Sequence, residues 1–169
     1  GGDRQTIIFN SQLRLLDANT MVGYRRLSGW QKERAVYFYA EFSRPVMQCI
    51  FRSGDDILTK TDVANGRNTK CFLSFFPDTK PLLIKVGISP VSIENAKENL
   101  KTENPGWDFE LIRTKAVEAW EKELSNIRIE GSDDQKAIFY TGLYHAYIQP
   151  NIVSDCNGDY TRTDYTTAR

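Results

Sequence analysis

The spacing of the apolar residues changes once along this sequence, close to Ser89. Before that point, from Thr6 onwards, apolar and polar residues alternate with a period of two, most clearly in residues 35–43 and 82–88. Such alternation gives each strand one buried and one partly wet face, which is typical of antiparallel sheets packed as a sandwich. In the second run, one face would carry Leu82, Ile84, Val86 and Ile88, and the other Lys85 and Gly87. The first half therefore predicts part of a β-sandwich.

After Ser89 the period lengthens to about 3.6 residues, which predicts helices. Ser92 is a suitable N-cap for a first helix, which the run Asn104-Pro105-Gly106 would end. Asp108 is a suitable N-cap for a second helix, whose apolar residues form one stripe: Phe109, Ile112, Ala116, Trp120 and Leu124. We expect these two helices to connect the sandwich to the part that follows.

Ser132 and Gln135 form a capping box that opens a third helix, extending to about Ile148. Apolar and aromatic residues occur nearly all round this helix, which therefore needs neighbours on several sides. The sequence offers few such neighbours, so we expect the helix to belong to a larger helical assembly. Beyond Pro150 the sequence is polar and without a period, which predicts a loop or a frayed end.

Composition excludes several classes of protein. Of the 169 residues, 40% are hydrophobic, which argues against disorder, and Lys+Arg and Asp+Glu both total 22, which leaves no basic footprint for nucleic acid. No apolar run approaches the roughly 20 residues that span a bilayer. The three cysteines, Cys49, Cys71 and Cys156, are not spaced as metal ligands, and we interpret them as buried small hydrophobic residues.

Residues 155–159 place three oxygen-bearing side chains at alternate positions: Asp155, Asn157 and Asp159. A calcium-binding EF-hand loop would need glycine at its sixth position and glutamate at its twelfth, but those positions hold Tyr160 and Thr166. The motif is therefore interpreted as a turn rather than an EF-hand, and no metal site is predicted within the chain.

Other candidate chemistry is sparse. The neighbouring acids Asp55/Asp56 and Asp133/Asp134 diverge in direction, so neither pair can flank a glycosidic bond. His145 is the single histidine, open to a structural or a substrate-contacting role. Exposed aromatic residues over a sheet can stack on sugars, and the candidates here are Tyr24, Trp30, Tyr37 and Tyr39; sheet packing is the alternative.

Three stretches of the sequence carry a resemblance to a known family: residues 23–45 (GYRRLSGWQKERAVYFYAEFSRP), 82–100 (LLIKVGISPVSIENAKENL) and 106–160. They resemble the calcium-dependent α-mannosidases of glycoside hydrolase family 92. The resemblance implies an α+β chain, with an antiparallel β-sandwich portion at 1–89 and connecting helices at 90–131. Residues 132–169 would then be the start of an incomplete (α/α)6 catalytic barrel, so that the chain is a middle fragment.

The resemblance further implies hydrolysis of α-mannosidic bonds, with the α-1,2 bond as the expected linkage, by inversion with calcium in the intact enzyme. The partners would be mannose-containing glycans, and the location secreted or periplasmic. No catalytic residue carries over, because the family's catalytic acids and its Trp-Asp sugar motif lie downstream, and Trp107-Asp108 belongs to a helix start. The fragment would be scaffold and cleft wall, inactive in isolation and without a cofactor of its own. Asp155, Asn157 and His145 are the residues expected to support or contact the substrate site.

Two other functions stay open. One is a non-catalytic carbohydrate-binding or interaction module built on a β-sandwich. The other is a structural domain of an unrelated helical-barrel glycosidase. The order of strands, connecting helices and an aromatic helix favours the enzyme fragment over a self-contained module.

Overall fold

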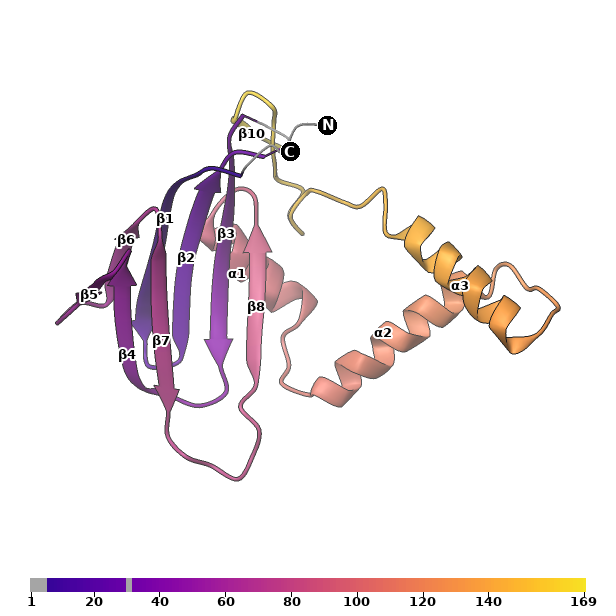
Figure 1. Ribbon diagram of the computed structural model, residues 1–169, viewed down its shortest axis with the longest axis horizontal. Helices are drawn as coiled ribbons and strands as arrows, with labels where there is room; N and C mark the ends of the chain where they lie inside the picture. Colours follow the sequence, from indigo (N-terminus) through magenta and orange to yellow (C-terminus); the bar gives the residue numbers. More distant parts are fainter. Residues whose placement is uncertain (1–5, 30–31) are drawn as a thin grey trace. The chain divides into compact units, whose positions relative to one another are not determined.

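The computed structural model describes residues 6–29 and 32–169. Strands come first, followed by helices and a short C-terminal hairpin (Figure 1). The strands are β1 (Ile8–Asp17), β2 (Thr20–Leu27), β3 (Arg34–Phe42), β4 (Val46–Ser53), β5 (Asp56–Leu58), β6 (Val63–Gly66), β7 (Thr69–Phe75) and β8 (Ile84–Ser89). They are followed by α1 (Ile93–Glu103), α2 (Phe109–Leu124), α3 (Asp133–Tyr147), β9 (Tyr160–Thr161) and β10 (Thr167–Ala168). The predicted α+β fold class, antiparallel sheets followed by helices, is confirmed.

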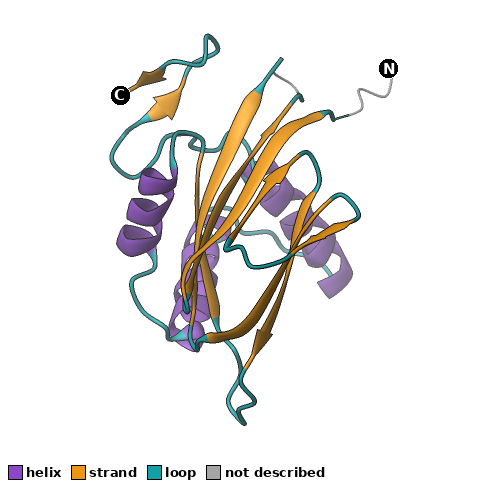
Figure 2. Ribbon diagram, turned by 90° about the vertical axis from the view of Figure 1, so that its left-hand side faces the viewer, coloured by secondary structure: helices purple, strands orange, loops and turns teal. Residues whose placement is uncertain are grey.

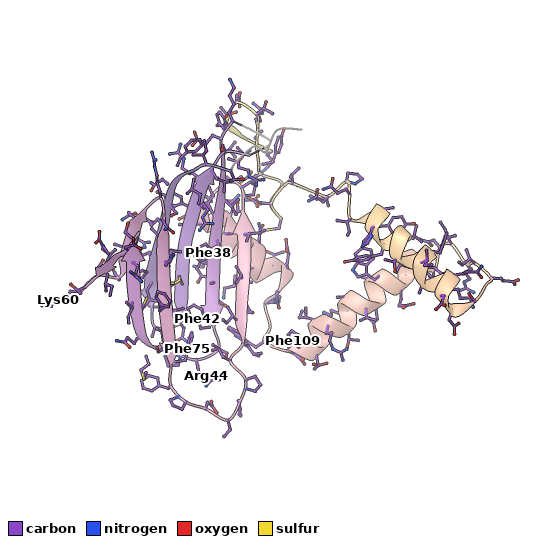
Figure 3. All side chains as sticks on the ribbon, viewed as in Figure 1. Phe38, Phe42, Arg44, Lys60, Phe75 and Phe109 are labelled. Carbon is purple, nitrogen blue, oxygen red and sulfur yellow. The ribbon has the colours of Figure 1, made fainter. Side chains whose placement is uncertain are left out.

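The strands up to β8 form two antiparallel sheets, which lie as two layers in Figure 2. The large sheet has the order β6-β1-β2-β3-β8, and the small sheet has the order β5-β4-β7. Their facing sides enclose a core of five buried apolar residues: Met21, Ala40, Phe42, Phe51 and Ala64. Figure 3 labels Phe42 and Phe75, whose rings meet edge to face across this core with centroids 5.3 Å apart. The predicted sandwich portion therefore has a real, if small, core.

Helix α1 packs on the outer face of the large sheet. Its Ala96 and Leu100 are buried against Val22 and Tyr39. The approach is close at Gly87, where an added Cβ would lie 2.1 Å from the carbonyl oxygen of Ala96. Only glycine leaves room for the helix backbone there, which explains its place in the middle of a strand.

Strand β8 buries the face opposite to the one that its apolar pattern suggests. Ile84, Val86 and Ile88 are 53%, 54% and 63% exposed, whereas Lys85 and Ser89 are 6% and 2% exposed. The three apolar residues pair in register with Phe42, Ala40 and Phe38, so they continue the core side of the large sheet. Because β8 is an edge strand that the small sheet leaves uncovered, this apolar face remains open, while α1 covers the polar one.

The chain divides into two compact units. One contains the sheets and α1 up to Trp107 and resumes at Ser154–Arg169; the other is Asp108–Val153. The helical unit contains α2 and α3, in which no residue is buried. Trp120 and Tyr144 form an aromatic contact across it with ring centroids 4.5 Å apart. The predicted boundaries at 89 and 131 follow sequence patterns rather than these contacts, and they stay a prediction.

Candidate functional site

The sheet unit buries the carboxylate of Asp155, which is only 6% exposed. Its Oδ2 accepts hydrogen bonds from Ser89 Oγ at 2.7 Å and Asn95 Nδ2 at 2.8 Å, and its Oδ1 accepts one from Asn99 Nδ2 at 2.7 Å. The three donors are neutral. A buried carboxylate needs such donors to offset the loss of water, and three short bonds supply them.

Local sequence explains why the donors converge. Ser89 ends β8, and its hydroxyl also accepts the backbone N–H of Val91 at 2.9 Å, which turns the chain towards α1. Ser92 then caps α1 by accepting the N–H of Asn95 at 3.0 Å, as predicted. Asn95 and Asn99 are four residues apart in α1 and therefore lie on one face of the helix. That face receives the returning chain.

Residues 155–159 form a closed turn on this face. The N–H of Asp155 donates to the carbonyl of Asp159 at 2.7 Å, and the N–H of Gly158 donates to the carbonyl of Asp155 at 2.8 Å. Gly158 has φ of +89°, a conformation that favours glycine. The backbone N–H of Cys156 donates a hydrogen bond to Asn99 Oδ1 at 2.8 Å. The predicted turn is therefore confirmed for this segment, and only the alternative of a frayed end is wrong, because contacts distant in sequence order the loop.

Asn157 and Asp159 form the outer layer of the turn. Asn157 Nδ2 donates to Glu98 at 3.2 Å and to Asp159 Oδ2 at 3.0 Å. Asp159 also accepts from Asn95 at 3.1 Å and pairs with Arg169 Nε at 3.0 Å. The hydrogen bond from Asn95, followed by the charge of Arg169, lowers the pKa of the Asp159 carboxyl. We call Ser89, Asn95, Asn99, Asp155, Asn157 and Asp159 the Asp155 cluster.

The structure brings two of the three candidate residues together. Asp155 and Asn157 lie in one turn of the sheet unit, and the solvated-turn alternative is wrong for Asp155. His145 lies in α3 of the helical unit, with its ring 5.7 Å from that of Tyr144. A supporting role in catalysis stays a prediction for all three.

Calcium does not fit the Asp155 cluster as it stands. Calcium needs six to eight oxygen ligands with free lone pairs, whereas Asp155 and Asp159 already accept N–H or O–H donors on both carboxylate oxygens. Over residues 6–29 and 32–169, no three His, Cys, Asp or Glu side chains are grouped so as to hold a metal ion. The hydrogen bonds of the cluster instead anchor the segment at residues 155–159 to Ser89 and to helix α1.

A second buried charge, Lys85, was not foreseen from the sequence. Its ammonium lies 3.3 Å from Glu41, donates to the carbonyls of Asn104 at 3.3 Å and Pro105 at 3.2 Å, and sits 4.4 Å from the ring centroid of Trp107. Burial works against ionisation of Glu41, but hydrogen bonds from Lys101 and Lys85 lower its pKa overall. Lys85 therefore fixes the segment after α1 to the sheet.

The aromatic residues considered for sugar stacking differ in exposure. Tyr24 and Tyr37 are partly exposed on the outer face of the large sheet, while Tyr39 is 8% exposed beneath α1; Trp30 lies outside the described residues.

Cys49 and Cys71 are free and half-buried, and burial, followed by the neighbouring Cys71, raises the pKa of Cys49 to about 11. Cys156 is exposed, so the prediction of burial is wrong for this residue.

Comparison with known proteins gives the family. Residues 3–89 match the model of the glycosyl hydrolase family 92 N-terminal domain, and residues 95–169 match that of the family 92 catalytic domain. The chain belongs to glycoside hydrolase family 92.

Solved structures agree with this assignment. A family 92 α-mannosidase from Bacteroides thetaiotaomicron is 30% identical, with a TM-score of 0.87 over 95% of this chain. An inverting family 92 mannosidase from the same organism is 28% identical, with a TM-score of 0.84 over 94% of this chain. The chain spans 23% of the length of each. The fold therefore corresponds to the β domain and the start of the helical domain of such enzymes.

A curated relative is described as an uncharacterized secreted glycosidase of Arthroderma benhamiae. It is 35% identical over 71 residues, which are 39% of this chain and 9% of that protein. In the part of the chain that the structure describes, no helix is long and apolar enough to cross a membrane.

Proposed function

We propose that this chain is part of an enzyme that hydrolyses α-mannosidic bonds with inversion. The observation that carries the proposal is the family match across both the β and the helical portions, together with the similarity to two solved mannosidases over nearly the whole chain. Cleavage of the α-1,2 bond and assistance by calcium are finer parts of the proposal, and the family resemblance supports them. Mannose-containing glycans are the proposed substrates.

Within that enzyme the sheet unit serves as scaffold and as one wall of the substrate cleft. Inverting glycosidases hold two carboxyl groups roughly 6.5–9.5 Å apart, one to protonate the leaving oxygen and one to activate water. Asp155 is not suited to either task, because both of its oxygens accept hydrogen bonds from protein donors away from solvent. Its role is to position the segment that follows residue 155.

The secreted or periplasmic location is also a proposal. It is supported by the Arthroderma benhamiae relative, a secreted glycosidase, and by the family resemblance, which implies a secreted or periplasmic enzyme.

The direct test is hydrolysis of α-1,2-mannobiose by the longer protein that contains this sequence. We expect release of mannose, with β-mannose as the first anomer seen by NMR, and loss of activity after chelation with recovery on adding calcium. Release of α-mannose first would contradict inversion, and activity unaffected by a chelator would contradict calcium assistance. No release from any α-mannoside would contradict the proposed function as a whole.

A further inference from the structure

Helix α1 leaves part of the outer face of the large sheet open. The helix packs against β8 and β3, where it buries Tyr39, and reaches β2, where it buries Val22 (Figure 1). On the same face of the sheet, Tyr24 lies two residues after Val22 on β2, and Tyr37 lies two residues before Tyr39 on β3. Tyr24 and Tyr37 pair across the strands and form the next row, which is partly exposed, in contrast to Tyr39.

Strand register fixes the members of this open row. Tyr37 pairs with Tyr24, Tyr24 pairs with Gln12, and Gln12 pairs with Asn65. Residues that pair directly across strands share one face of a sheet, so all four side chains lie on the outer face. Asn10, two residues before Gln12 on β1, extends the row on the same face.

The side chains of the row form an ordered surface. The two tyrosine rings have centroids 5.8 Å apart and are tilted by 47°. Asn10 Nδ2 donates to the Tyr24 hydroxyl at 3.2 Å, and Gln12 Nε2 donates to Asn65 Oδ1 at 2.8 Å. These bonds use one N–H each of Asn10 and Gln12 and one carbonyl lone pair of Asn65, which leaves further N–H groups and lone pairs for a ligand.

The chemistry of the row selects a neutral polyhydroxyl ligand. All five side chains are uncharged, and the nearby Arg26 is paired with Glu33, which lessens its pull on an anion. Aromatic rings supply apolar contact area to the C–H faces of pyranose rings. Amides beside them donate to and accept from neighbouring hydroxyl groups.

We propose that Asn10, Gln12, Tyr24, Tyr37 and Asn65 form a glycan-binding platform on the outer face of the sheet. The proposal rests on the proposed function for its choice of ligand, an α-linked mannooligosaccharide. The tyrosines stack on sugar rings, and the amides hold hydroxyl groups at the edge. The platform keeps a polymeric substrate near the enzyme between cleavage events.

The test is titration of α-1,2-linked mannotriose into the 169-residue chain, followed by NMR shifts of the tyrosine rings and by calorimetry. We expect shifts at Tyr24 and Tyr37, and affinity about three- to tenfold weaker for Tyr37→Ala, the range that aromatic contacts contribute. Tyr37→Phe keeps the ring and should bind within about twofold of the original chain. Tyr160→Ala, at an exposed tyrosine of the C-terminal hairpin, is the matched control and should change nothing.

Gln12→Leu removes an amide and leaves both rings, so it tests the platform even where loss of a tyrosine disturbs the sheet; we expect at least threefold weaker binding. Absence of shifts at saturating mannotriose, or equal affinity for the Tyr37→Ala and Tyr160→Ala variants, would overturn the platform. Hydrolysis by the longer protein is measured separately. Hydrolysis without binding at these residues refutes only the platform, whereas binding without hydrolysis refutes only the proposed function.

Discussion

Replacing Asp155 with alanine should detach the C-terminal turn from α1. The substitution removes an acceptor that is 6% exposed and receives three hydrogen bonds of 2.7–2.8 Å, and it leaves Ser89, Asn95 and Asn99 facing a small cavity. A hydrogen bond to a charged group contributes about 1.5–3 kcal/mol, and such bonds are not additive in one cluster. Because the amides regain water once the turn opens, we expect a net loss of about 3 kcal/mol in the stability of the sheet unit.

The assay should report on the turn itself, since two compact units need not unfold together. Hydrogen exchange at Cys156 N–H, which is bonded to Asn99 Oδ1, follows the turn directly. Urea unfolding gives the free energy. Asp55→Ala, at an exposed loop aspartate, is the matched control and should cost less than about 0.5 kcal/mol.

Asp155→Asn separates charge from shape. It keeps the size of the side chain but turns one acceptor into a donor that faces another donor, so it should also destabilise the turn, by about 1–3 kcal/mol. If Asp155→Ala costs no more than Asp55→Ala and leaves the exchange of Cys156 unchanged, the carboxylate is not an anchor and the reasoning is wrong.

Three further outcomes are expected. The isolated chain should release no mannose from α-mannosides, because the family resemblance places both catalytic acids downstream of this sequence, and calcium-dependent release by the purified chain would refute this. Phe139, Leu143 and Tyr147 of α3 should bind a hydrophobic dye and promote self-association, since no residue of that helix is buried; a dye-free, monodisperse monomer at high concentration would contradict it. The C-terminal turn should loosen in acid. Folding lowers the pKa of Asp159 below its unfolded value, which is near 3.8. The carboxylate therefore contributes its full stabilisation of the turn above the unfolded pKa and loses it as pH falls through the lower folded pKa. Exchange of the Asp155 N–H that is unchanged between pH 6 and about pH 2.5, after correction for intrinsic rates, would refute that last expectation.

Local sequence was enough to predict the elements, and the reason is that their signals lie within a few residues. Ser92, Asp108 and Ser132 each cap a helix by accepting a backbone N–H three residues on, as expected. Period-two alternation found β3 and β8, and family resemblance gave the order of the parts. Each of these features depends on hydrogen bonds or side-chain directions that a short window contains.

Tertiary structure decided what those elements bury. The pattern of β8 shows two faces but not which one is covered, and α1 covers Lys85, Gly87 and Ser89 while the small sheet stops short of Ile84, Val86 and Ile88. Asp155 reads locally as part of a polar turn, yet Ser89, which is 66 residues away, helps to bury and satisfy it. Partners at such separation leave no local period or spacing, so only the folded chain shows that this carboxylate is an anchor and that Tyr24 and Tyr37 share an open face.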